Sequence, residues 1–212
     1  DVLVVTGSGM VRRGQVQPML DGFDECAIRY TLQTFDHPDP TSDDVEAGYK
    51  TFKENGCKTI VALGGGSPID CAKAIAFGAD YNGDVWDFFD GKAKIIKCLP
   101  IAVVLTLPAA GSEGSASCVI SNDAVSAKRG VGADIMRPAL AFMDPETTFS
   151  LPPYQTAAGV TDMIAHICER YFSGQGPALV TDALAASLIR TLIASAPKAL
   201  ADPRDYEARA AI

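Results

Sequence analysis

A run of three glycines, Gly64 to Gly66, joins an apolar segment to a segment with helical signals, and it constrains the fold more than any other feature. The preceding residues 59–63 are Thr-Ile-Val-Ala-Leu, a composition typical of a buried β-strand. Ser67 is expected to cap the following helix, with Pro68 in its first turn and Asp70 reaching back to the cap. A strand that turns directly into a helix predicts an α/β fold with a parallel sheet.

Consecutive glycines at such a turn also suit a phosphate-binding loop. Glycine has no Cβ atom and adopts positive φ readily, so backbone N–H groups can approach a pyrophosphate closely at the helix N-terminus. Taken alone, the same residues are explained equally well as a tight turn between a strand and a helix. The spacing matches neither the GxGxxG fingerprint nor the GxxxxGK[ST] P-loop, so neither of these standard nucleotide sites is predicted.

Apolar and helical segments alternate along the first half of the chain. The pattern predicts strands at 2–5, 27–35, 59–63 and 101–107, and helices at 15–21, 43–55 and 68–78. Ser42 is the expected N-cap of the helix at 43–55, and Gly56 is its expected stop. This alternation indicates a parallel sheet flanked by helices.

The pattern changes in the second half of the chain. Short extended pieces at 117–142 predict a hairpin and then a strand at 139–143, and helices are predicted at 156–172 and 178–200. The second helix carries an apolar stripe made of Leu179, Ala183, Ala186, Ile189 and Leu192. We therefore predict an α/β dinucleotide-binding domain over residues 1–152 and the first helices of an all-α domain over 153–212.

Composition excludes several classes of partner. A formal net charge of -8 argues against nucleic acid, which requires clustered Lys and Arg. The six cysteines are widely spaced without a CxxC pair, so they are expected to be reduced and buried. We find no signal segment and no apolar stretch of membrane-spanning length, and we expect a cytoplasmic protein without a membrane partner. The chain begins within a strand pattern and stops within a helical one, which suggests a fragment.

Four ordered motifs identify a resemblance that runs over essentially the whole chain. They are GGGSPIDCAKAIA at 64–76, LTLPAAGSE at 105–113, FMDPETTFSLPP at 142–153 and AAGVTDMIAHICERYFS at 157–173. These motifs resemble the iron-dependent, group III alcohol dehydrogenase family, and the last resembles its butanol dehydrogenase and aldehyde reductase branch. The resemblance implies a dehydroquinate synthase-like architecture, in which NAD(P)H and a divalent metal lie between an α/β domain and a helical domain. It also implies hydride transfer between nicotinamide and a primary alcohol or aldehyde.

The resemblance assigns cofactor-binding roles to individual positions. Gly65, Gly66, Ser67 and Asp70 are expected to hold the pyrophosphate and the adjoining ribose. Thr106 and Ser112 are expected to line the adenine and nicotinamide side, and Lys128, in the Asp-x-Lys-like hairpin position, to bind the nicotinamide ribose.

The first strand end bears on cofactor choice. The family's NAD users typically have Asp after this strand to accept the ribose 2′-OH, whereas this chain has Gly7 followed by Ser8. Without that carboxylate, Ser8 and the neighbouring N–H groups, with Arg12 or Arg13 nearby, could bind a 2′-phosphate. NADP(H) is therefore favoured over NAD(H), although residues 6–9 also read as an ordinary flexible turn.

Asp162 and His166 are the expected metal ligands. Their i, i+4 spacing puts both side chains on one helix face, where an ordinary Asp–His hydrogen bond is the alternative. In the family motif these positions match the first two ligands of a divalent metal, Fe or Zn, which would polarise the carbonyl. The family supplies two further histidines, but His37 is the only other histidine here and is interpreted as a surface residue. No catalytic residue is predicted beyond the metal ligands.

Several positions leave alternatives open. Ala109 or Ala110 stands where the family usually has threonine, so a hydroxyl contact to the cofactor is expected to be missing. Glu113 and Lys73 are as readily solvent-exposed or cap-supporting residues as direct contacts. A glycerol dehydrogenase-like or dehydroquinate synthase-like relative and a non-catalytic cofactor-binding fragment are the competing interpretations. A small alcohol or aldehyde is the expected substrate, and the family commonly forms homodimers.

Overall fold

A computed structural model describes residues 1–173, 176 and 178–212, and the chain forms two compact units. Unit 1 comprises residues 1–105 and 112–142, and unit 2 comprises residues 106–111 and 143–212. The structure thus divides the chain after residue 142 rather than after residue 152. The physical reason is that Leu107, Pro108 and Thr148 line one small pocket with Thr156 and Arg209 of the helical unit.

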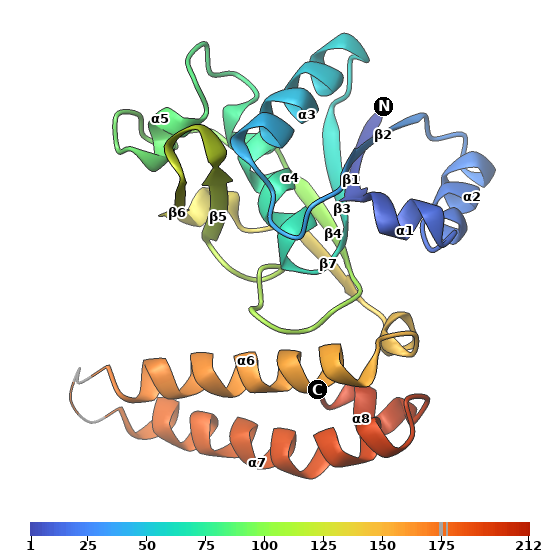
Figure 1. Cartoon of the computed structure of the whole chain (residues 1–212), viewed down its shortest axis with the longest axis vertical. Coiled ribbons are helices and arrows are strands. Elements are labelled where there is room, and N and C mark those ends of the chain that lie inside the picture. The colour runs from blue at the N-terminus through green and yellow to red at the C-terminus, as the bar shows by residue number, and fades with distance from the viewer. Residues whose placement is uncertain (174–175, 177) are drawn as a thin grey trace. The chain divides into compact units, whose positions relative to one another are not determined.

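Unit 1 contains the predicted parallel sheet, with strand order β2-β1-β3-β4-β7 (Figure 1). The strands are β1 (Val2–Gly7), β2 (Tyr30–Phe35), β3 (Thr59–Gly64), β4 (Ile101–Leu105) and β7 (Leu140–Met143). β1 pairs in parallel with β2 and β3, and β3 with β4. A separate antiparallel hairpin consists of β5 (Ser117–Asn122) and β6 (Ala127–Gly132), joined through the 3₁₀ turn η1 (Asp123–Val125).

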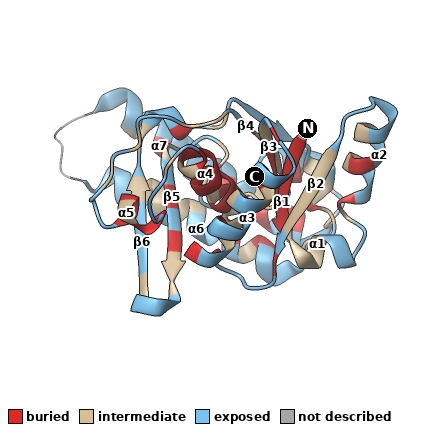
Figure 2. Ribbon diagram, turned by 90° about the horizontal axis from the view of Figure 1, so that it is seen from above, coloured by how far each residue is buried: buried red, intermediate tan, exposed pale blue. Residues whose placement is uncertain are grey.

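Helices cover both faces of this sheet. The helical elements are α1 (Ser8–Arg12), α2 (Gln17–Glu25), α3 (Ser42–Glu54), α4 (Gly66–Gly78), α5 (Trp86–Phe89) and η2 (Asp134–Met136). Figure 1 shows α3 and α4 on one side of the sheet and α1 and α2 on the other. Strand alternation explains this, because Leu3 packs with Ile75 of α4, whereas the adjacent Val4 packs on the face that holds Phe23 of α2. α4 is buried along most of its length (Figure 2).

The N-cap predicted for α3 is wrong by one residue. Thr41 caps this helix, and Ser42 is its first residue. The Thr41 hydroxyl accepts the backbone N–H of Asp44 at 3.2 Å, and the Asp44 carboxylate accepts the Thr41 N–H at 2.8 Å. This capping box needs an acid three residues after the cap, and Asp44 stands at that distance from Thr41.

Unit 2 is built from helices. It contains η3 (Pro145–Thr148), α6 (Pro153–Tyr171), α7 (Leu179–Ala201) and α8 (Tyr206–Ala210). α6 and α7 lie side by side (Figure 1), and Val160 of α6 belongs to one core cluster with Leu192 and Ala196 of α7. The predicted stripe is wrong over most of its length: Leu179, Ala183 and Ala186 are exposed and Ile189 is half-buried. Of its residues only Leu192 is buried, because the packed face of α7 runs through Ala185, Leu192, Ala196 and Ala199.

α7 also corrects the expectation that no stretch reaches membrane-spanning length. By length and composition it is long and apolar enough to cross a membrane, with a mean hydropathy of 1.5 and 11% of the apolar window buried in the described chain. One helix of this kind is weak evidence for a membrane span, because core helices of soluble proteins pass the same test.

The cysteines are all free thiols in the structure. Cys57, Cys71 and Cys118 are buried as expected, whereas Cys26 is exposed. Cys26 is the C-cap of α2, which places it on the surface. Burial raises the pKa of Cys98 to about 11, so this thiol is protonated near neutral pH.

Candidate functional site

The carboxyl ends of β1 and β3 form the point at which the chain leaves the sheet in opposite directions. β1 leads to α1 and α2 on one face, and β3 leads to α4 on the other. The Thr6 hydroxyl donates to the Leu63 carbonyl at 2.8 Å, which joins the two strand ends. Open α/β sheets bind their ligands outside the carboxyl ends of the strands at such a switch point. The predicted residues Gly7, Ser8 and Gly65 to Ser67 all follow these two strands.

The glycine loop has the backbone that its sequence predicts. Gly64 has a φ of +145°, a conformation available to glycine and strained for other residues, and a Cβ there would lie 2.7 Å from the Pro68 ring. In contrast, a Cβ on Gly66 or on Gly7 would meet no atom of the described chain within 4 Å. Packing within the protein therefore does not require glycine at these two positions. Open space beside a glycine backbone fits a loop that a pyrophosphate approaches closely.

The predicted cap of the next helix is wrong. α4 begins at Gly66 with Gly65 as its N-cap, and no side chain of the described residues caps it. Ser67 lies inside the first turn and donates instead to the Pro38 carbonyl at 2.6 Å. Because no side chain caps the helix start, its first N–H groups and the positive end of the helix dipole are available to an anion.

A loop that sequence reasoning missed contacts three of the predicted cofactor residues. This β2–α3 loop, residues 36–40, lies at the carboxyl end of β2. Asp36 accepts from the Ser8 hydroxyl, and the Pro38 carbonyl accepts from Ser67. Asp39 pairs with Lys128 of β6 at 2.9 Å between Oδ2 and Nζ. The available signal was a polar segment, Asp-His-Pro-Asp-Pro, directly after a parallel strand.

Asp36 is also paired with Arg12. Arg12 Nη1 lies 3.1 Å from Asp36 Oδ1, and both side chains are exposed. The hydrogen bond from Ser8, and then the one from Arg12, lower the pKa of Asp36. The neighbouring His37 lies with Nδ1 3.4 Å from Asp44 Oδ2 and has a half-exposed side chain, in agreement with a surface histidine.

Both carboxylate oxygens of Asp70 accept hydrogen bonds from other residues of this chain. Its Oδ1 accepts from the Ser112 hydroxyl at 2.6 Å, and its Oδ2 accepts from the Val119 N–H at 2.9 Å. Burial raises the pKa of Asp70, and the hydrogen bonds from Ser112 and Val119 oppose this shift. The carboxylate thus ties α4 to Ser112 in the segment between β4 and β5 and to Val119 of β5. A role for Asp70 and Ser112 toward a ribose or nicotinamide stays a prediction.

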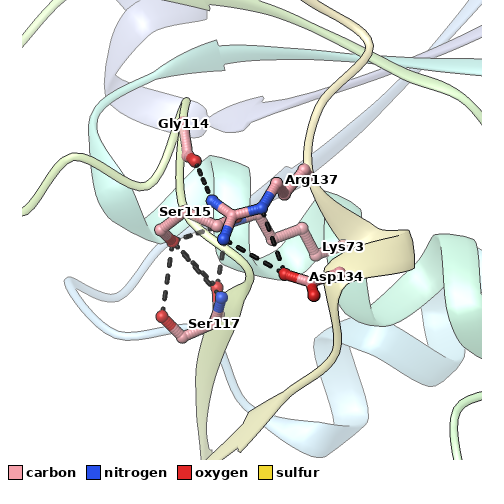
Figure 3. A network of polar contacts seen from close by, with 6 residues as sticks. All are labelled: Lys73, Gly114, Ser115, Ser117, Asp134 and Arg137. Carbon is pink, nitrogen blue, oxygen red and sulfur yellow. Dashed lines mark hydrogen bonds and ion pairs between the residues drawn. The ribbon is translucent and has the colours of Figure 1, made fainter.

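Lys73 is fully buried, so of the alternatives that its sequence leaves open the structure removes the solvent-exposed one. Its Nζ donates to the carbonyl oxygens of Ser112, Ser115 and Ser117 at 2.7, 3.0 and 2.8 Å, respectively. It also lies within hydrogen-bond distance of two hydroxyl oxygens, that of Ser112 at 2.9 Å and that of Ser115 at 3.2 Å. Burial lowers the pKa of Lys73, and the Asp70 charge opposes this shift. Figure 3 draws Lys73 together with Arg137, which donates to the Gly114 carbonyl at 2.7 Å. These two cations shape the segment 112–117.

The remaining predicted residues lie in unit 2. Thr106 follows β4 and is half-buried. Asp162 and His166 lie on one face of α6 with 3.7 Å between Oδ1 and Nε2, and Glu169 Oε2 lies 3.8 Å from the other ring nitrogen. Among the described residues, no group of three or more His, Cys, Asp or Glu side chains is arranged to hold a metal ion. The pair fits part of a metal site, and a complete site needs further ligands.

Comparison with family models covers nearly the whole chain. Residues 1–145 match the model described as iron-containing alcohol dehydrogenase, and residues 156–212 match the C-terminal model of the Fe-containing alcohol dehydrogenase family.

Individual relatives agree with this match. NADH-dependent butanol dehydrogenase A of Clostridium acetobutylicum is 42% identical over 210 residues, which are 99% of this chain and 54% of the relative. NADPH-dependent aldehyde reductase YqhD of Escherichia coli is 35% identical over 216 residues, again 99% and 54% of the two chains. The crystal structure of NADH-dependent butanol dehydrogenase A from Thermotoga maritima superposes with a TM-score of 0.94 at 36% identity, covering 99% of this chain and 53% of that one. The chain thus spans about half the length of the relatives it matches.

Proposed function

Because the chain belongs to the iron-containing alcohol dehydrogenase family, we propose that unit 1 binds a nicotinamide dinucleotide and that the whole protein reduces aldehydes or oxidises primary alcohols with it. The observation that carries the proposal is the uncapped start of α4 at the switch point, with open space beside Gly66. Backbone N–H groups at this position suit the pyrophosphate, and the absence of a Cβ permits close approach.

Gly66→Ala tests this proposal directly. The new Cβ meets no described atom within 4 Å, so the fold should tolerate it, and alanine is the better helix former. If the pyrophosphate lies against this backbone, the methyl group will weaken dinucleotide binding about tenfold or more through steric exclusion. Binding is followed by the change in NADPH fluorescence on titration, and folding by the emission of the single tryptophan, Trp86.

The matched control is Gly22→Ala on α2, where a Cβ also meets no described atom within 4 Å. This variant should bind the dinucleotide as the wild type does. Equal affinity in Gly66→Ala and Gly22→Ala would contradict the assignment of the pyrophosphate to the start of α4. Failure of the wild-type chain to bind either NADH or NADPH would contradict the proposed function of unit 1.

For the cofactor we propose NADP(H). Gly7 supplies no carboxylate to repel a 2′-phosphate, and Ser8 and Arg12 already share an anion, the carboxylate of Asp36. Relatives carry both names, NADH-dependent and NADPH-dependent, so they support a nicotinamide dinucleotide without distinguishing the two. Gly7→Asp should shift the preference toward NADH, because a side chain at this position has open space within the described chain. Tighter binding of NADH than of NADPH by the wild type would refute this choice.

We further propose that Asp162 and His166 supply two ligands to a divalent metal in the whole protein. When bound, that metal would act as a Lewis acid on the substrate oxygen. The side chains of this pair lie on one helix face, with 3.7 Å between Oδ1 and Nε2, and the relatives extend well beyond the length of this chain. We expect the 212-residue chain to bind NADPH but not to reduce butyraldehyde with added Fe²⁺ or Zn²⁺. Robust metal-dependent turnover by this chain would refute the requirement for more ligands.

A further inference from the structure

Asp36 occupies a position from which it can govern cofactor choice. It follows β2 directly, and the parallel register that pairs Gly7 with Phe35 brings the ends of β1 and β2 together. Its Oδ1 accepts hydrogen bonds from the Ser8 hydroxyl and from Arg12 Nη1 at 3.1 Å. The carboxylate therefore contacts Ser8 and Arg12, the two side chains that the proposed function assigns to the 2′-phosphate of NADP(H).

The two groups that contact Asp36 identify an anion position. A serine hydroxyl and an arginine guanidinium are typical partners of phosphate, and here they converge on a carboxylate oxygen. We propose that Asp36 is a cofactor-specificity residue. Its carboxylate occupies the position that Ser8 and Arg12 contact and so competes with a 2′-phosphate there, whereas it accepts a hydrogen bond from the free 2′-OH of NAD(H). This inference rests on the proposed function, namely that unit 1 binds a nicotinamide dinucleotide.

The surroundings of Asp36 allow either its own carboxylate or a cofactor phosphate to contact Ser8 and Arg12. The side chains of Arg12 and Asp36 are 69% and 73% exposed, so solvent and salt weaken their attraction and a phosphate can replace the carboxylate. The lowered pKa of Asp36, caused first by the Ser8 hydrogen bond, keeps this group ionised near neutral pH. An ionised carboxylate repels a phosphate dianion but not a hydroxyl, so its presence disfavours one cofactor selectively.

The same position suits ribose recognition in related sheet topologies. In dinucleotide-binding α/β folds, an acidic residue beyond the glycine loop accepts the ribose 2′-OH. In this chain the acid that is absent at Gly7 is supplied instead from the end of the neighbouring strand β2. Asp36 therefore limits the preference for NADP(H) that Gly7 and Ser8 create.

Asp36→Asn tests the proposal. The amide removes the charge while keeping the size of the side chain, so NADPH should bind more tightly and NADH equally or more weakly. The ratio of NADPH to NADH affinity should rise at least about fivefold at low ionic strength, and this gain should shrink as salt increases. Arg12→Met should lower the ratio, because it removes the cation from the same position. Both dinucleotides are titrated by fluorescence against the 212-residue chain.

Asp24→Asn is the matched control. Asp24 is an exposed residue of α2, before the amino end of β2, and its substitution changes the net charge by the same amount. This variant should leave the affinity ratio within about twofold of the wild type, since its charge is remote from the site. An unchanged ratio in Asp36→Asn, with both dinucleotides still bound, overturns the role of Asp36 alone. Absence of binding of either dinucleotide to the wild type overturns the proposed function together with this inference.

Discussion

Lys73→Met removes the buried cation that organises the segment between β4 and β5. Five acceptor atoms of Ser112, Ser115 and Ser117 lie between 2.7 and 3.2 Å from its Nζ. An ammonium has three N–H donors, so it satisfies about three of these acceptors at a time. Methionine fills a similar volume without a donor, and it leaves the carbonyl oxygens of the segment without this partner.

The expected loss follows from two opposing effects. A hydrogen bond from a charged donor contributes about 1.5–3 kcal/mol, whereas taking an ammonium out of water costs several kcal/mol. When the donor of such a buried group is removed, each acceptor left unsatisfied lowers the stability by about 1–3 kcal/mol. With some rehydration of the segment, we expect the free energy of unfolding to fall by about 3–5 kcal/mol. For a chain of this length, that lowers Tm by about 6–20 °C.

Urea unfolding followed by Trp86 fluorescence measures this loss. Trp86 is the single tryptophan and is buried in unit 1, so its emission reports on the unit that contains Lys73. Lys50→Met is the control, because Lys50 is an exposed residue of α3 that pairs with Glu54 at 3.9 Å. This control should stay within about 0.5 kcal/mol of the wild type. Equal unfolding midpoints for the two methionine variants would refute the structural role of the buried ammonium.

Three further predictions concern backbone, thiol and carboxylate. Gly64→Ala should destabilise unit 1 by about 1–3 kcal/mol in the same urea assay, because of the positive φ and the contact with Pro68. Cys26 should be the fastest thiol to react with a thiol-specific reagent at pH 8, since the other cysteines are at least partly buried, and Cys26→Ser should remove that phase. Burial raises the pKa of Asp70 above 3.8, so the native state binds more protons than the unfolded state between the two pKa values. Asp70 should therefore contribute a loss of stability as pH rises through this window, and the slope of Tm against pH should be more positive in Asp70→Asn than in the wild type.

Local signals in the sequence were sufficient for the parallel sheet and for its glycine loop. The run 59–66 specifies a buried strand and then a backbone with positive φ at Gly64, and both depend on neighbouring residues alone. The long helices α6 and α7 were predicted close to their observed bounds for the same reason, since helical periodicity is a short-range pattern.

Only the tertiary structure decided which side chains meet. Asp36 and Ser8 are 28 residues apart, and Lys73 and Ser112 are 39 apart, so no short-range pattern pairs them. Strand order and register place the ends of β1, β2 and β3 together, and this gives Ser67 a carbonyl partner in the β2–α3 loop in place of the predicted cap. The sequence alone therefore determined the elements and the backbone of the loop. Packing between distant segments determined which polar groups are buried, which are paired and which face a ligand.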